Sequence, residues 1–407
     1  MPASMNNDIA LFKFIYCWYI VFYHFFQAED GLFIGGYYGV EFYVLVAGIF
    51  FFRAYERQAE SGSLMTPGEY FKKRFSRLFP WAFTAFLFTL LLVRRTFFLH
   101  GFSFETLLDF FSDDIWEILL LKWNGMNIGN SLMLNVPAWT MSSLLLVGFF
   151  LWCVLYYHHR EYLGFIMPVS LLIGYGFWRH LPEAYAGTWV GFTTVGTLRT
   201  YLAMCMGYYS LQLSKKLADI PFNDLGSFLL SIVELIGHGF LIFAMLNRDT
   251  RNYQWLCTLV IFLVCAIALS GKSTLCRVLN RSRFIPYLQK LSLSVYLVHF
   301  GTFELYHLAF GESKSALHLA ALVGMIIVVS VCHKLITEQI IALHTRLWPR
   351  FLAKITSRES LTSLWHSSLI SIFIPFFRKG KEAFIHESSA ISRRPRHPYQ
   401  PVPVRQP

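Results

Sequence analysis

The chain has 407 residues, of which 55% are hydrophobic and only 14% are charged. Because soluble domains carry about 25% charged residues, this composition excludes an ordinary soluble protein and indicates a membrane protein. The net charge of +11 would fit a nucleic-acid-binding protein. Much of the excess, however, lies in loops on one side and in the C-terminal tail, as positive-inside topology predicts. We therefore expect membrane lipid, and no nucleic acid, among its partners.

Ten apolar segments follow one another along the chain, each near the roughly 20 residues that a membrane-spanning helix needs. Only helices and closed barrels satisfy the backbone in lipid, and these segments lack the alternation of a barrel. The sequence therefore predicts an all-α membrane protein, a bundle of about ten transmembrane helices. The predicted spans lie near residues 9–27, 35–52, 78–99, 137–157, 162–178, 197–213, 227–246, 253–270, 288–310 and 316–340.

The charges of the connecting loops predict the orientation of the spans. The connection 53–77 carries six basic residues, and 271–287 carries four with no acid, whereas 28–34 carries only acids. Ten spans place both basic loops and both termini on the cytoplasmic side. The first apolar run lacks a small-residue cleavage site, so we interpret it as a retained span. We expect a multi-pass protein of the plasma (inner) membrane.

The rest of the chain divides into smaller parts around a transmembrane domain, residues 1–345. The outer connection 100–136 is predicted to lie along the surface as a short amphipathic helix. Residues 346–377 include LTSLWHSSLISIFIPFF, which is short for a span and is predicted to be an amphipathic or interfacial segment. Residues 378–407 are basic and Pro-rich, and we predict a disordered C-terminal tail.

Three ionisable residues stand out in the first two spans: Lys13, His24 and Glu41. Charged groups at membrane depth are costly, so they usually face a bundle interior or a wet cavity and mark function. Lys13 and His24 are eleven residues apart, close to three helical turns, so they share one face about 16 Å apart along the axis. One helix face thus carries two polar groups at opposite ends of a span.

Several further motifs follow in order. Arg74 and Arg77 precede Pro80 in an R-x-x-R-x-x-P pattern, Trp139 lies in PAWTMS, and Arg199 lies in a polar helix start. Tyr296 lies within the segment LSLSVYLVH, and His299 is its last residue. Glu41 lies in GVEFY, and Lys13 and His24 open the series.

Taken together, these motifs over residues 9–340 resemble the acyltransferase-3 family of integral-membrane acyltransferases. Several positions differ from the family pattern: Lys13 stands where Arg is usual, Glu41 where Asp is usual, Ala47 where Ser is usual, and Leu144 where many members have Glu. The resemblance implies transfer of an acyl group, usually acetyl from acetyl-CoA, to a hydroxyl of an extracytoplasmic or lipid-linked glycan. Acetyl-CoA would then be a co-substrate, with no bound cofactor, and the acceptor a cell-surface glycan or lipid-linked sugar.

The residue chemistry is compatible with an O-acetyltransferase. Arg74 and Arg77 suit the phosphates of the acyl donor, and Lys13 could hold its arm. His24 titrates near neutrality and is the candidate general base, with Glu41 as the carboxylate that orients it. The candidates for the cavity or acceptor site are Trp139, Arg199, Tyr296 and His299.

Other roles for these residues stay open. Lys13 could snorkel to the cytoplasmic headgroups, His24 could be an interfacial residue, and Glu41 could pair with Lys13 or Arg199. In a different class, a multi-pass transporter or flippase would use Lys13, His24 and Glu41 as a proton or substrate path, but the repeats common in transporters are not evident.

The sequence indicates no metal site and no disulfide framework. The seven cysteines include no C-x-x-C pair. His158 and His159 are adjacent, so they point apart on a helix, and no nearby Cys or carboxylate completes a metal set. We therefore expect no bound metal.

Overall fold

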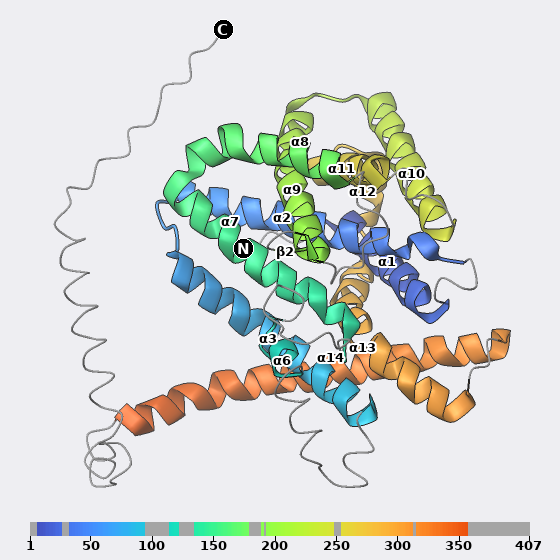
Figure 1. Ribbon diagram of the computed structural model, residues 1–407. Coiled ribbons are helices and arrows are strands. Elements are labelled where there is room, and N and C mark those ends of the chain that lie inside the picture. The colour runs from blue at the N-terminus through green and yellow to red at the C-terminus, as the bar shows by residue number, and fades with distance from the viewer. Residues whose placement is uncertain are drawn as a thin grey trace. The chain divides into compact units, whose positions relative to one another are not determined.

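The computed structural model describes residues 6–26, 32–93, 114–121, 134–178, 189–190, 193–247, 254–311 and 315–356 (Figure 1). These residues are almost wholly helical, as the sequence predicts. Among them, the only strands are the antiparallel pair β1 (Trp189–Val190) and β2 (Thr193–Thr194).

Each of the ten predicted spans overlaps a helix of the structure, and residues 94–99 of the third lie outside the described residues. In chain order the α-helices are α1 (Asn7–Phe26), α2 (Tyr38–Glu60), α3 (Pro67–Val93), α6 (Ile115–Ile118), α7 (Trp139–Glu161), α8 (Met167–Trp178), α9 (Val195–Asp219), α10 (Asp224–Leu246), α11 (Gln254–Ser270), α12 (Thr274–Leu279), α13 (Ile285–Phe310) and α14 (Ala316–Thr356). Short 3₁₀ turns, η2 (Ile34–Tyr37) and η4 (Val136–Ala138), precede α2 and α7.

Six helical regions of the described chain are long and apolar enough to cross a membrane, so the count of ten spans is not confirmed. The region Val136–Phe177 contains two predicted spans, which are joined through a non-helical His158 (φ −138°, ψ 41°) and a π turn at Tyr162–Ile166. Helix α11 has only 17 residues. Helices α9 and α13 are long enough but carry polar side chains, including the candidate site residues.

The chain divides into two compact units, Met1–Gln339 and Ile340–Pro407. All residues discussed below belong to the first unit, and the described part of the second is the continuation of α14 to Thr356. Residues 357–377 and 378–407 lie outside the described residues, so the interfacial segment and the disordered tail stay predictions. So does most of the outer connection 100–136, in which the structure describes α6.

Among the described helices, α2 and α9 form the most extensive contact, and two glycines allow their backbones to approach. A Cβ atom on Gly207 would lie 2.6 Å from the carbonyl oxygen of Leu45, and a Cβ on Gly48 would collide with the backbone of Met204. The two backbones therefore meet directly, as small residues allow in membrane bundles. This contact sets α2 and α9 at the distance that joins Glu41 to Arg199.

Replacing Gly207 with Ala is expected to destabilise the protein by about 1–3 kcal/mol, because the added methyl group overpacks a backbone contact. Thermal unfolding in detergent measures the effect. The matched control is Gly239→Ala on α10, where nothing lies within 4 Å of the added Cβ. That control is expected to be neutral or slightly stabilising, since Ala is the better helix former. Equal stability of the two variants would contradict the prediction.

Candidate functional site

Lys13 lies inside the helix bundle and contacts α2. Its ammonium Nζ is 4.6 Å from the centroid of the Tyr43 ring, a cation–π geometry. The hydroxyl of Tyr43 donates a hydrogen bond to the carbonyl oxygen of Lys13, 2.7 Å away. Lys13 is only partly exposed, so Tyr43 holds both its backbone and its charged group.

Tyr43 connects this lysine to α13. Its ring stacks on that of Tyr296, with centroids 5.9 Å apart and an interplanar angle of 22°. The hydroxyl of Tyr296 donates to the carbonyl oxygen of Pro137, 3.1 Å away, and lies 2.9 Å from the hydroxyl of Thr140. Tyr296 is therefore fixed against the start of α7, within the PAWTMS motif.

His24 and His299 form a pair at the other end of α1. Their ring centroids are 5.4 Å apart with an interplanar angle of 28°, and Phe300 packs 5.0 Å from His24. Nδ1 of His299 is 2.8 Å from the carbonyl oxygen of Tyr296. Because that oxygen can only accept, Nδ1 carries a proton, and the neutral ring has its lone pair on Nε2. This Nε2 atom is buried and has no hydrogen-bond partner among the described residues.

These contacts join the two polar groups of α1. We call the series Lys13, Tyr43, Tyr296, His299 and His24 the polar file. Its remaining link is the contact of Tyr296 with His299, whose ring centroids lie 6.2 Å apart. Residues from α1, α2 and α13 thus form a continuous line of cationic, aromatic and imidazole groups. The line begins at Lys13 and ends at His24, the two residues predicted to share one face of the first helix.

Glu41 pairs with Arg199. Nη2 and Nε of Arg199 lie 2.6 and 2.7 Å from Oε1 of Glu41, and the two side chains are only 13% and 12% exposed. The guanidinium also lies 5.3 Å from the centroid of the Tyr37 ring. This ion pair is one of the alternatives that the sequence left open. The role of Glu41 as the carboxylate that orients His24 stays a prediction.

Arg74 and Arg77 lie on the first half of α3, but their environments differ. Arg74 is partly buried, and its Nε atom is buried with no hydrogen-bond partner among the described residues. Arg77 is exposed. An unpaired guanidinium N–H group is costly to bury, so Arg74 is the one of the two that calls for an anionic partner.

The start of α7 is held by a carboxylate from the outer connection. Glu117, only 3% exposed, accepts hydrogen bonds from the backbone amides of Leu134 and Asn135, each 2.9 Å away. The side chain of Asn135 donates to the carbonyl oxygen of Leu297, 3.0 Å away. These bonds fix the segment that leads to Trp139, which is buried at the first position of α7.

Sequence reasoning missed Tyr43, Thr140 and Glu117 as contributors to this site. Tyr43 lies in the second-span motif and Thr140 in the PAWTMS motif, so their positions beside named candidates could have indicated them. Glu117 gave no such signal, because it is one of several acids in a connection that resembles a solvated surface.

The helices and the polar file define a helical membrane protein with ionisable side chains arranged across the bundle. Comparison with protein families identifies its kind: a family model described as an acyltransferase domain matches residues 6–335. The chain belongs to the acyltransferase-3 family, as its motifs predict, and is a membrane acyltransferase. No curated protein and no solved structure matches it.

Proposed function

We propose that this membrane acyltransferase moves an acetyl group from cytoplasmic acetyl-CoA to a hydroxyl of a cell-surface glycan or lipid-linked sugar. The observation that supports the proposal is the polar file, which connects Lys13, on the predicted cytoplasmic half of α1, with the histidine pair near its predicted outer end. The donor arm would run along this line, so that its thioester meets the acceptor beside His24.

In the proposed reaction the acceptor hydroxyl gives its proton to a ring nitrogen of His24. The hydroxyl oxygen attacks the thioester carbonyl, the new C–O bond forms, and the C–S bond breaks. The departing thiolate takes a proton from the imidazolium and leaves as CoA-SH toward the cytoplasm. Atoms and charges balance without a metal or a covalent enzyme intermediate. General-base catalysis of this kind contributes about 10²–10⁴-fold.

His299 supports His24 in this scheme. Its proton is committed to the Tyr296 carbonyl, which leaves a buried Nε2 lone pair without a partner among the described residues. The ring centroids of the two histidines are 5.4 Å apart. At this separation His299 can stabilise the charged form of His24 through a shared proton or an intervening hydroxyl. This pair takes the place that a carboxylate occupies in a catalytic triad.

The direct test is transfer of labelled acetyl groups by the purified protein. The full chain, reconstituted in lipid vesicles with its N-terminal side accessible, is given acetyl-labelled acetyl-CoA and a glycan fraction. We expect alkali-labile label in the glycan and one CoA-SH released per ester formed. Movement of glycan or protons across the membrane without ester formation would instead support the transporter alternative.

The donor site makes a separate prediction. Arg74→Ala is expected to raise KM for acetyl-CoA about 10–100-fold with kcat changed less than about threefold, because a hydrogen bond to a charged group contributes about 1.5–3 kcal/mol. Steady-state kinetics in membranes measures both constants. The matched control is Lys72→Ala, which removes an exposed positive charge from the same helix. A KM increase of the same size in Lys72→Ala would show that the effect is only one of net charge.

A further inference from the structure

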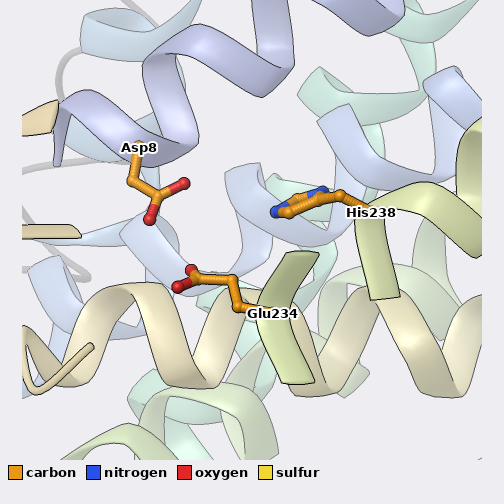
Figure 2. Close-up of side chains that lie close together, drawn as sticks. All are labelled: Asp8, Glu234 and His238. Atoms are coloured by element: carbon orange, nitrogen blue, oxygen red, sulfur yellow. The ribbon is translucent and has the colours of Figure 1, made fainter. Parts of the chain in front are cut away.

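A second group of ionisable side chains lies outside the polar file, between α1 and α10. Asp8 belongs to the first turn of α1, and Glu234 and His238 are four residues apart on one face of α10. The three residues are 0%, 0% and 3% exposed. One ligand atom from each residue lies within 4.8 Å of the other two. Figure 2 shows both carboxylates and the imidazole edge converging on one space.

The two acids lack the partners that buried carboxylates require. All four carboxylate oxygens of Asp8 and Glu234 are buried, and none has a hydrogen-bond partner among the described residues. The carboxyl groups of Asp8 and Glu234 lie beside each other, and the hydroxyl of Ser273 lies beside Glu234, but this hydroxyl has only one proton to offer. In the described part of the chain, no Lys or Arg forms an ion pair with either acid. Two such carboxylates side by side are strongly unfavourable without a cation.

The histidine of this group is already oriented. Nδ1 of His238 lies 2.6 Å from the hydroxyl of Tyr16, and its ring stacks on Phe12 with centroids 3.3 Å apart and an interplanar angle of 5°. Metal-binding histidines commonly engage one nitrogen in such an outer contact, which sets the ring direction and leaves the other nitrogen for the ion. When Nδ1 donates its proton to the Tyr16 oxygen in this contact, Nε2 carries the lone pair and faces the space between the carboxylates.

We propose that Asp8, Glu234 and His238 bind a divalent metal ion of the Zn²⁺ or Mn²⁺ type. Two carboxylates and a neutral imidazole carry a charge of −2, which a divalent ion cancels inside the bundle. Carboxylate oxygen with imidazole nitrogen is a donor set that suits these ions.

The geometry requires the three side chains to move closer together. Donor atoms at about 2.0–2.2 Å from one ion lie about 3.3–3.6 Å apart in a tetrahedral arrangement, so separations of up to 4.8 Å must close by up to about 1.5 Å when the ion binds. The ion would tie the first turn of α1 to the middle of α10. It would thereby fix the helix that carries Lys13 and His24, whichever acyl group and acceptor the enzyme uses.

The test is the metal content of the full chain, purified in detergent, stripped with EDTA and dialysed against ZnCl₂ or MnCl₂. We expect about one ion per chain by mass spectrometry, and a melting temperature that rises when the ion is restored. Asp8→Asn and Glu234→Gln are each expected to lower affinity for the ion at least about tenfold and to lose the metal-dependent rise. The control, Asp224→Asn, removes an exposed acid at the start of α10 and is expected to bind normally.

Tyr16→Phe provides a second measurement that leaves all three ligands in place. Loss of the contact that orients His238 is expected to weaken metal binding about 10–100-fold. A wild-type chain that binds neither ion after dialysis would overturn the proposal, as would full metal content in Asp8→Asn. An infrared band of a protonated carboxyl group that disappears in Glu234→Gln would then identify a proton as the cation between the two acids.

Discussion

His24→Ala is expected to lower kcat for acetyl transfer by about 10²–10⁴-fold, the contribution of a positioned general base. KM for acetyl-CoA is expected to change little, because in the proposed function the phosphates of the donor bind at Arg74 and not at His24. The measurement is transfer of labelled acetyl groups in membranes at matched protein levels. Activity within about threefold of wild type would end the assignment of His24 as the base.

Two variants sharpen this experiment. His307→Ala removes an exposed imidazole from the last turn of α13, the helix that carries His299, and is expected to retain full activity. The double variant His24→Ala/His299→Ala tests whether the two imidazoles act together. Residues that act as a unit are non-additive, so the double variant is expected to lose little more than His24→Ala alone. A loss of kcat in the double variant equal to the product of the two single losses would show that His299 acts independently of His24.

Arg199→Ala is expected to destabilise the protein by about 3–5 kcal/mol, because it leaves the Glu41 carboxylate buried without its partner. Thermal unfolding in detergent measures the loss. The same two helices provide a matched control: Lys215 on α9 pairs with Glu56 on α2 at 2.8 Å, with side chains 49% and 23% exposed. Lys215→Ala is expected to cost about 1 kcal/mol or less.

A double replacement separates the structural from the catalytic role of this pair. Glu41→Leu/Arg199→Leu removes both charges and is expected to recover most of the stability lost in Arg199→Ala. If Arg199→Ala is as stable as Lys215→Ala, the prediction that the buried pair stabilises the protein is contradicted. Loss of activity in a fully stable double variant would show that Glu41 and Arg199 take part in the reaction itself.

Much of the helical architecture follows from local sequence. Long apolar runs predict helices directly, and a separation of eleven residues is enough to place Lys13 and His24 on one face. The number of membrane spans is harder to predict, because some helices carry several polar side chains along their length. Helices α9, with Arg199, and α13, with His299, are not among the six described regions apolar enough to cross a membrane.

Partners are harder to predict than helices. Glu41 pairs with Arg199, which is 158 positions away. From the sequence alone, His24, Lys13 and Arg199 were all possible partners. The group of Asp8, Glu234 and His238 was missed for the same reason. The spacing of Glu234 and His238 indicates a shared helix face, but no local pattern indicates that Asp8, from the start of the chain, completes it.

The carboxylate of Glu117 has a consequence for how the enzyme could respond to its acceptor. It anchors the long outer connection to the backbone just before α7. The side chain of Asn135 in turn donates a hydrogen bond to the carbonyl oxygen of Leu297, two residues before His299. Under the proposed function, a shift of this connection on acceptor binding would reach α13 through these hydrogen bonds, two residues before His299. Acceptor binding and the alignment of the histidine pair would then be coupled.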